Sequence, residues 1–243
     1  MSRQLKKFIY GVFYLAVFGL ILFGVWKSVF RVKPTCPDDV GDCGGAGILK
    51  LESIKSVGEI RVFGLSSGKA VLAAEIENPN ADFGATFSYN FKIYDGGGNL
   101  LETIPDESNV YMGERKFIYA PQVVSVLPNI SKVQIEFFDT KWEAAKGLAK
   151  PDLSAENILT EVGVAGIKVS GIIKNTGPFA AKNLEVIAFL SDSENFEIFA
   201  SKTFIANLEN FAEKPFVISF PADKDLARKV DLKATKVFVS VGF

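Results

Sequence analysis

Few of the chain's 243 residues carry side chains suited to acid–base, nucleophilic or metal chemistry. The sequence contains no histidine, which removes Ser-His-Asp and Cys-His nucleophiles as well as histidine metal sites. The only two cysteines are Cys36 and Cys43, and a closed structural zinc site needs four Cys or His ligands. The commonest catalytic arrangements and a structural zinc site are therefore excluded.

Carboxylates are the remaining candidates for catalysis. Asp106 with Glu107, and Asp192 with Glu194, are pairs of the kind that glycoside hydrolysis uses. Both pairs fall in segments that we expect to be turns between strands, where solvated charges are ordinary. We therefore expect no catalytic residues, no cofactor and no enzymatic activity.

Three further acids, Asp38, Asp39 and Asp42, surround the cysteines. They could offer oxygen ligands to calcium, but the longer EF-hand pattern that ends in a bidentate Glu is absent. A solvated acidic turn is the favoured interpretation, and no metal site is expected.

The two cysteines lie seven positions apart in the stretch 34–47, which is rich in Pro, Asp and Gly. Such a stretch is typical of a linker, and the short separation allows a small loop to close in an oxidising compartment. We predict a Cys36–Cys43 disulfide. Mass spectrometry of the protein isolated without reductant should find no free thiol, and Cys36→Ser should leave the melting temperature nearly unchanged because the loop belongs to a linker.

Residues 8–26 form an uninterrupted apolar stretch without charge, proline or amide side chain. As a helix with a rise of ~1.5 Å per residue the stretch would reach roughly 28 Å, close to the thickness of a bilayer's hydrocarbon core. Tyr10 and Trp26 lie near its two ends, where such rings favour the headgroup region. The alternative is a buried core helix, but such helices are seldom apolar on all sides. We expect a transmembrane helix within 8–30 that binds the lipid bilayer.

This helix is expected to stay on the mature protein. The residues after Trp26 are bulky and basic, without the small residues that a signal peptidase site requires. Three basic residues flank each side, so the loop charges alone do not set the orientation. The helix's position at the start of the chain and the cysteine pair beyond it favour a cytoplasmic N-terminus, an extracytoplasmic ectodomain and a cell-membrane location.

The charge balance argues against nucleic acid as a partner. Residues 1–33 hold six basic residues and no acidic one, which leaves 21 basic against 28 acidic residues in the remainder. An acidic ectodomain repels phosphates instead of neutralising them.

From residue 48 onward, short runs rich in Val, Ile, Phe and Thr alternate with Gly, Asn, Asp and Pro clusters. This spacing is typical of an all-β sandwich. Within 86–95 the alternation places Phe87, Tyr89, Phe91 and Ile93 on one face of a half-buried strand. The glycine run 96–98 then predicts a hairpin turn, since no helix follows it to bind a phosphate.

A weak internal repeat of roughly a hundred residues divides the ectodomain. The string 73–79 resembles 170–176, with Asn78 and Asn175 in equivalent positions; likewise 91–95 resembles 188–192, and 113–117 resembles 212–216. We predict a mainly β protein in which an N-terminal transmembrane helix precedes two tandem immunoglobulin-like antiparallel β-sandwich domains. The boundaries are a cytoplasmic tail 1–7, the helix 8–30, a linker 31–47, a first sandwich 48–149 and a second sandwich 150–243, with 142–148 as a short helical connector.

These residues resemble a known group of envelope domains. The string Phe91-Lys92-Ile93-Tyr94-Asp95 is similar to the eponymous string of FxLYD-type domains, while the second copy keeps only Leu190 and Asp192 of it. Asn78-Pro79-Asn80 resembles the turn of the water-stress (late-embryogenesis type 2) β-sandwiches. The resemblance implies an immunoglobulin-like sandwich without catalytic residues, often carried on a membrane anchor.

Two functions of different classes follow. The first is a membrane-anchored, non-catalytic interaction or scaffold protein whose loops and sheet edges bind an envelope or cell-surface protein. The alternative is an envelope carrier or sensor that binds an apolar ligand, such as a lipid, within a β-sandwich; a cavity of several hundred Å³ would favour it. Asn129 opens a formal N-glycosylation sequon, and its use stays an open question.

Overall fold

The computed structural model describes residues 50–123 and 127–242, and these residues are mainly β. Their elements, in chain order, are β1 (Lys55–Gly64), β2 (Ala70–Glu77), β3 (Phe83–Tyr94), β4 (Leu100–Val110), β5 (Arg115–Val123), η1 (Leu127–Asn129), β6 (Lys132–Ala144), η2 (Ala145–Gly147), β7 (Leu153–Gly163), β8 (Gly166–Asn175), β9 (Ala181–Ser191), β10 (Glu197–Leu208), β11 (Glu213–Ser219), α2 (Lys224–Lys229) and β12 (Lys236–Gly242). Residues 51–243 form one compact unit.

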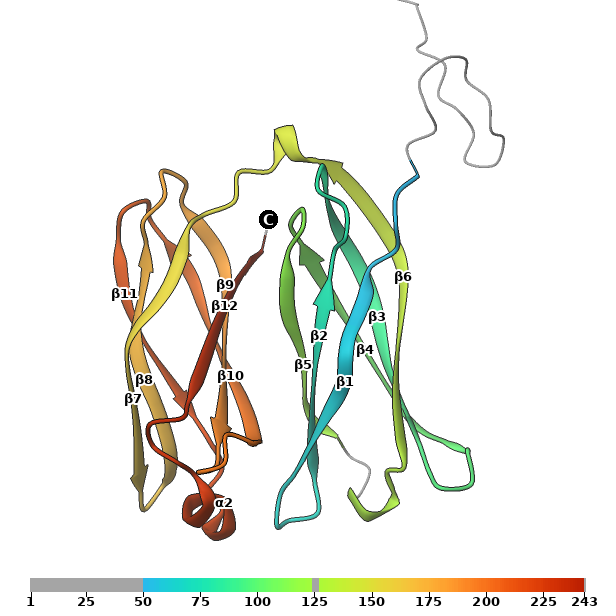
Figure 1. Cartoon of the computed structure of the whole chain (residues 1–243), viewed down its shortest axis with the longest axis vertical. Helices are drawn as coiled ribbons and strands as arrows, with labels where there is room; N and C mark the ends of the chain where they lie inside the picture. Colours follow the sequence, from blue (N-terminus) through green and yellow to red (C-terminus); the bar gives the residue numbers. More distant parts are fainter. Residues whose placement is uncertain (1–49, 124–126, 243) are drawn as a thin grey trace, which may run out of the picture. The chain divides into compact units, whose positions relative to one another are not determined.

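The strands make four antiparallel three-stranded sheets (Figure 1). Strands β1 to β6 form the sheets β1-β2-β5 and β4-β3-β6, and strands β7 to β12 form β11-β8-β7 and β10-β9-β12. We call β1–β6 the first half and β7–β12 the second half. The pairing order repeats strand for strand between the halves, so the internal repeat seen in the sequence is also a repeat of sheet topology.

The core of the first half lies between its two sheets. The predicted face of β3 is buried as expected, since Phe87, Tyr89, Phe91 and Ile93 are all at most 2% exposed. They pack against a group of side chains from β2 and β5: Leu72, Ala74, Ile76, Ile118 and Ala120. The prediction that alternate residues of this strand share one buried face is confirmed.

A second core cluster combines side chains of both halves. Val71, Ala73 and Phe117, on the other face of the β1-β2-β5 sheet, belong to the same buried cluster as Ile187 and Phe189 of β9. Strand β2 is consequently buried on both faces, which explains why its sequence Ala-Val-Leu-Ala-Ala-Glu-Ile-Glu is nearly all apolar instead of alternating.

The aspartate that ends the F-x-I-Y-D string fixes a hairpin turn. Asp95 Oδ1 accepts hydrogen bonds from the amides of Gly97 and Asn99, each at 2.8 Å. Asp192 accepts equivalent bonds from Glu194 at 3.0 Å and Phe196 at 2.9 Å. An aspartate that binds the amides ahead of it stabilises a tight turn, so the glycine run is a turn, as predicted.

The predicted helical connector differs from the structure. Residues 142–148 were expected to form a helical connector, but Trp142, Glu143 and Ala144 continue strand β6 and only Ala145–Gly147 form a 3-10 turn. The difference has a physical cause, because Trp142 pairs with Ala85 of β3 and packs against the first core. The sequence pattern after Phe137 did not show this long-range pairing.

Several predictions fall on residues outside those described. They are the tail 1–7, the transmembrane helix 8–30 and its contact with the bilayer through 8–26, the linker 31–47, and the Cys36–Cys43 disulfide. Over residues 50–123 and 127–242, no helix is long and apolar enough to cross a membrane. The division into domains near residue 149 also stays a prediction.

The buried face of β3 yields a direct test. Phe91→Ala should lower the free energy of unfolding by about 3 to 5 kcal/mol, because the removed ring leaves a cavity in a filled core. Lys92 points to the opposite face, where it pairs with Glu136 at 2.6 Å with both side chains partly exposed, and Lys92→Ala should cost little. Urea denaturation of the two variants measures the difference; similar losses would contradict this core.

Candidate functional site

A buried asparagine organises one end of the first half. The Asn78 side chain is fully buried, and its Nδ2 donates to the carbonyls of Phe83 at 2.7 Å and Tyr111 at 3.0 Å. Phe83 is the first residue of β3, directly after the β2–β3 loop, and Tyr111 lies in the β4–β5 loop. The Asn78 carboxamide therefore holds the two loops together.

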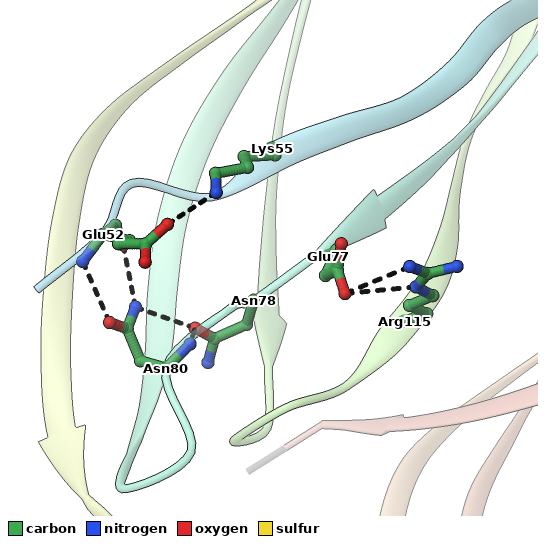
Figure 2. Close-up of polar contacts among 6 residues, drawn as sticks. All are labelled: Glu52, Lys55, Glu77, Asn78, Asn80 and Arg115. Carbon is green, nitrogen blue, oxygen red and sulfur yellow. Dashed lines mark hydrogen bonds and ion pairs between the residues drawn. The ribbon is translucent and has the colours of Figure 1, made fainter.

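The neighbouring Asn80 extends this network to the incoming chain (Figure 2). The Asn80 side chain accepts a hydrogen bond from the Glu52 amide at 2.9 Å and donates to the Glu52 carbonyl at 2.7 Å. Its Nδ2 also donates to Asn78 Oδ1 at 3.0 Å. The Asn-Pro-Asn turn thus acts as a structural clasp.

Two ion pairs flank the clasp in Figure 2. Lys55 pairs with Glu52 at 2.6 Å, and Arg115 pairs with Glu77 at 3.2 Å. Exposed pairs of this kind contribute little to stability. The clasp therefore depends on its amide bonds.

The second half repeats the arrangement around Asn175, which is 1% exposed. Its Nδ2 donates to the carbonyls of Phe179 at 2.8 Å and Glu209 at 3.1 Å. The amide of Thr176 donates to the Asp152 carbonyl at 2.9 Å, so this turn too is joined to the segment that precedes the first strand of its half.

The loops held by Asn175 present two exposed aromatic rings. Phe179 is 48% exposed and Phe211 is 69% exposed. Phe211 has a φ of 55°, a left-handed conformation that is rare for a bulky residue. In the first half the equivalent turn position is Gly113, with a φ of 61°. A phenylalanine thus replaces glycine where glycine is the favoured residue.

The contact between the two halves is rich in aromatic rings and includes the cations Arg61 and Lys202. The guanidinium of Arg61, on β1, lies 4.7 Å from the ring centre of Phe117 and 4.9 Å from that of Phe189, and its Nη1 lies 2.6 Å from a carboxylate oxygen of Glu197. Partly desolvated cation–π contacts are stronger than exposed ones, so this cluster joins β1 and β5 to β9 and β10.

Polar bonds add to the contact between the halves. The hydroxyl of Tyr119 donates to the Ala200 carbonyl at 3.3 Å, and burial raises the pKa of Tyr119 to about 12. The Ser66 amide donates to the Asp223 carboxylate at 2.9 Å. Hydrogen bonding by the Ser66 side chain, together with the amides of Ser66 and Leu226, holds the pKa of Asp223 well below its usual range. The two halves are therefore joined at several places along the contact.

Lys116 is a buried charged residue on β5. It pairs with Ile76 in the β-ladder, so it lies on the inner face of its sheet, and it is only 8% exposed. Within the described residues its ammonium has no hydrogen bond or ion pair. Burial lowers the pKa of Lys116 from its usual 10.5, although attraction to Glu185 and Glu114 partly offsets the effect.

Two cavities between the halves share Lys116 and Ser240. The first, of about 200 Å³, has largely apolar walls from Phe117, Ile187, Phe238 and Val239, together with Glu75 and Arg115. The second, of about 280 Å³, is more polar and is lined by residues that include Asn109, Asn183, Glu185 and Phe204. We call the two together the Lys116 crevice.

Asp106 and Glu107 lie within strand β4 and pair with β3, so the prediction of a turn there is wrong. Both Asp106 and Asp192 have structural bonds. Asp106 accepts hydrogen bonds from the Tyr89 hydroxyl at 3.1 Å and the Glu107 amide at 2.8 Å, and Asp192 fixes its turn as described. Among residues 50–123 and 127–242, no group of three Cys, Asp or Glu residues is placed to hold a metal ion. Cys36 and Cys43 lie outside the described residues.

Sequence reasoning did not identify Lys116. In the strand pairing its equivalent in the second half is Lys214, which pairs with Ile173 as Lys116 pairs with Ile76 and which is exposed. Asn183 and Ser240 of the second half line the same cavity as Lys116. No local pattern in the sequence signals such a contact.

Comparisons with known proteins do not assign the chain to a family. No family model matches it, and no curated protein matches it. A red sea bream transglutaminase crystal structure aligns with 78% of this chain and 31% of its own length, at 11% identity and a TM-score of 0.22. The chain thus spans about a third of that enzyme, and a similarity this low carries no argument.

The cost of burying Lys116 can be measured. Lys116→Met keeps the length of the side chain but removes the unpaired charge, and should raise the free energy of unfolding at pH 7 by about 1 to 3 kcal/mol. Between the lowered pKa of Lys116 in the folded protein and its usual pKa of 10.5 in the unfolded chain, the unfolded chain binds more protons than the folded protein. The free energy of unfolding of the wild type therefore rises with pH through that range.

The advantage of Lys116→Met should therefore shrink as the pH rises toward 10.5. Lys168→Met, at an exposed position of β8, is the matched control and should change little. Unfolding by urea at several pH values measures both variants. A destabilised Lys116→Met protein at pH 7 would show that the ammonium has a favourable partner.

Proposed function

We propose that the chain is a membrane-anchored, extracytoplasmic interaction protein of the cell envelope and is not an enzyme. In this proposal residues 8–30 form the transmembrane anchor, and the two halves are tandem immunoglobulin-like β-sandwich domains of the kind found in FxLYD-type and water-stress proteins. The repeated three-plus-three strand order supports the domain type, and the apolar stretch 8–26 supports the anchor.

The observation that carries the proposal is Phe211. A buried polar network holds its loop, yet its ring is 69% exposed at a backbone conformation where the first half has Gly113. A left-handed conformation costs a bulky residue roughly 1 to 2 kcal/mol, and an apolar ring in water gains nothing in return within the fold. Local strain of this kind is concentrated at binding and active sites.

Phe179 adds a second ring to the same loop pair, since Asn175 donates to the carbonyls of Phe179 and Glu209. Exposed aromatic anchors on rigid loops are typical of protein-binding surfaces, where a few such residues provide most of the binding energy. A protein partner in the same envelope would meet the tethered surface at high effective concentration, so modest affinity would suffice. We call Phe179 and Phe211 the aromatic loop pair.

The carrier alternative has less support. The space between the sheets of the first half is filled by large side chains that include Phe87, Tyr89 and Phe91, and filled cores leave no room for a lipid tail. The cavities of the Lys116 crevice lie between the halves, and a ligand there would be small. An open cavity of about 800 Å³ lies between β1 and β6 of the first half and is lined in part by Ile60, Val62, Ile130 and Val133, so an apolar ligand of the carrier alternative would have to bind at that edge of the sandwich.

Replacing the aromatic loop pair separates binding from folding. Phe211→Gly restores the residue type of the equivalent turn and should change the free energy of unfolding by no more than about 1 kcal/mol. Combined with Phe179→Ser, it should reduce crosslinking of the full-length chain to its envelope partner at least about tenfold, because hot-spot residues each contribute about 2 kcal/mol or more. Quantitative mass spectrometry of crosslinked cells measures the change.

The matched control is Phe196→Ser, which removes a ring that is 65% exposed in the β9–β10 turn. It should leave the crosslinked partner unchanged. Equal crosslinking by wild type and the double variant would refute the loop surface. Turnover of ester, glycoside, phosphate or peptide substrates that disappears on replacing one acidic residue would refute the non-catalytic assignment.

A further inference from the structure

We propose that the open cavity between β1 and β6 binds an extended segment of another protein, which adds to β6 as a further strand of the β4-β3-β6 sheet. The cavity, of about 800 Å³, is lined by Ser56, Gly58, Glu59, Ile60, Val62, Ile130, Ser131, Lys132 and Val133. We call it the β1–β6 groove. It belongs to the first half, so it is separate from the aromatic loop pair.

The two strands that border the groove are both sheet edges. Among the described residues, β1 pairs only with β2 and β6 only with β3. An edge strand has a row of backbone N–H and C=O groups without strand partners, and an extended segment of another chain can pair with them. The groove therefore offers backbone hydrogen bonds as well as apolar side chains.

The second half closes the equivalent edge, which lies between β7 and β12. The hydroxyls of Thr160 and Thr235 form a hydrogen bond of 2.6 Å that joins β7 to the residue before β12, and Thr160 is only 5% exposed. The strand registers of the two halves place Val62 and Val133 at these two positions. Both valines are partly exposed and line the groove. The first half thus has apolar side chains at an open edge where the second half has a closing hydrogen bond.

A wider bulge in β1 accompanies the groove. Between Val57 and Arg61, the three residues Gly58, Glu59 and Ile60 lie opposite a single residue of β2, whereas the bulge of β7 places two residues opposite one of β8. All three bulge residues line the groove. Because a bulge bends an edge strand and disrupts regular pairing, we assign the backbone hydrogen bonds of the added segment to β6.

The residues of β6 determine the sequence pattern of the segment. Along 132–137 they alternate between solvent and the first core, where Val133, Ile135 and Phe137 pack. A strand added to the sheet continues this alternation, so every second residue of the segment is apolar and enters the groove. Lys132 and Glu59 line the groove, are exposed, and form no ion pair within residues 50–123 and 127–242. An acidic residue beside Lys132 and a basic residue toward Glu59 complement these charges.

A lipid tail fits the groove less well than a protein strand. Ser56, Ser131 and the two charged residues line the same cavity as the valines, and the edge of β6 adds backbone polar groups. Polar groups that lose water without gaining a hydrogen bond cost free energy. A hydrocarbon chain has no donor or acceptor, whereas an extended peptide supplies both.

The test uses the purified full-length chain and the end-blocked peptide Lys-Val-Thr-Val-Asp-Val as the probe. Calorimetry should find binding with a Kd on the order of 0.1 mM, as suits a short peptide. The peptide should slow amide hydrogen exchange in 132–137 and leave 236–241 unchanged. The peptide Lys-Thr-Asp-Val-Val-Val, which lacks the alternation, should bind at least about tenfold more weakly.

Two variants test the two parts of the surface. Val62→Thr with Val133→Thr copies the closing pair of the second half and should weaken binding at least about tenfold. Lys132→Glu, at an exposed position, should weaken it about threefold to tenfold, and a peptide with Lys in place of Asp should restore it. Lys141→Glu, exposed on the same strand beyond the left-handed Asp139, is the matched control and should bind as the wild type does.

No peptide binding up to about 20 times that Kd would overturn the proposal. Equal binding of the two peptides, unchanged exchange in 132–137, or unchanged binding by Lys132→Glu would do the same. Displacement of the peptide by dodecanoate would instead assign the groove to a lipid tail and would also overturn the proposal.

Discussion

Burial of the β1-β2-β5 sheet on both faces is the constraint on which the remaining structure depends. One face closes the core of the first half through Leu72 and Ile76, and the other packs on β9 through Ala73 and Phe117. A half-buried antiparallel sheet keeps one face for solvent, but this sheet has no solvent face over most of β2. Separating the halves would expose Phe117 and remove the Phe189 ring and the Glu197 carboxylate from Arg61, so the two halves are structurally interdependent.

The two copies of the strand pattern keep the same polar turns and differ in what those turns present. Asn78 and Asn175 make equivalent bonds to two loops, and Asp95 and Asp192 fix equivalent hairpins. Around these fixed points the second copy has Phe211 in place of glycine. The residues whose hydrogen bonds stabilise each half are thus different from the residues to which we assign binding. A substitution in one of these groups can leave the other group unchanged.

Features that depend on near neighbours in the chain could be predicted from the sequence, whereas features that depend on long-range contacts could not. The alternation in 86–95 and the glycine turn depend on neighbours in the chain, so both were predictable, as was the repeated asparagine. Strand β6 was predicted too short because its last residues, including Trp142, are held by pairing with β3. The burial of Lys116 and the exposure of Phe211 depend on contacts from segments about a hundred residues away or on loop conformation, and no periodic pattern encodes either.

The clasp between Glu52 and Asn80 also has a mechanical consequence. A pulling force that reaches residue 51 along the backbone must first stretch the two hydrogen bonds between Glu52 and Asn80 before it can act on the first bonds of β1. Asn80 is itself hydrogen-bonded to Asn78, whose carboxamide donates hydrogen bonds to the carbonyls of Phe83 and Tyr111. Load on a tether would therefore be shared among β2, β3 and β4 instead of peeling off the edge strand β1 alone.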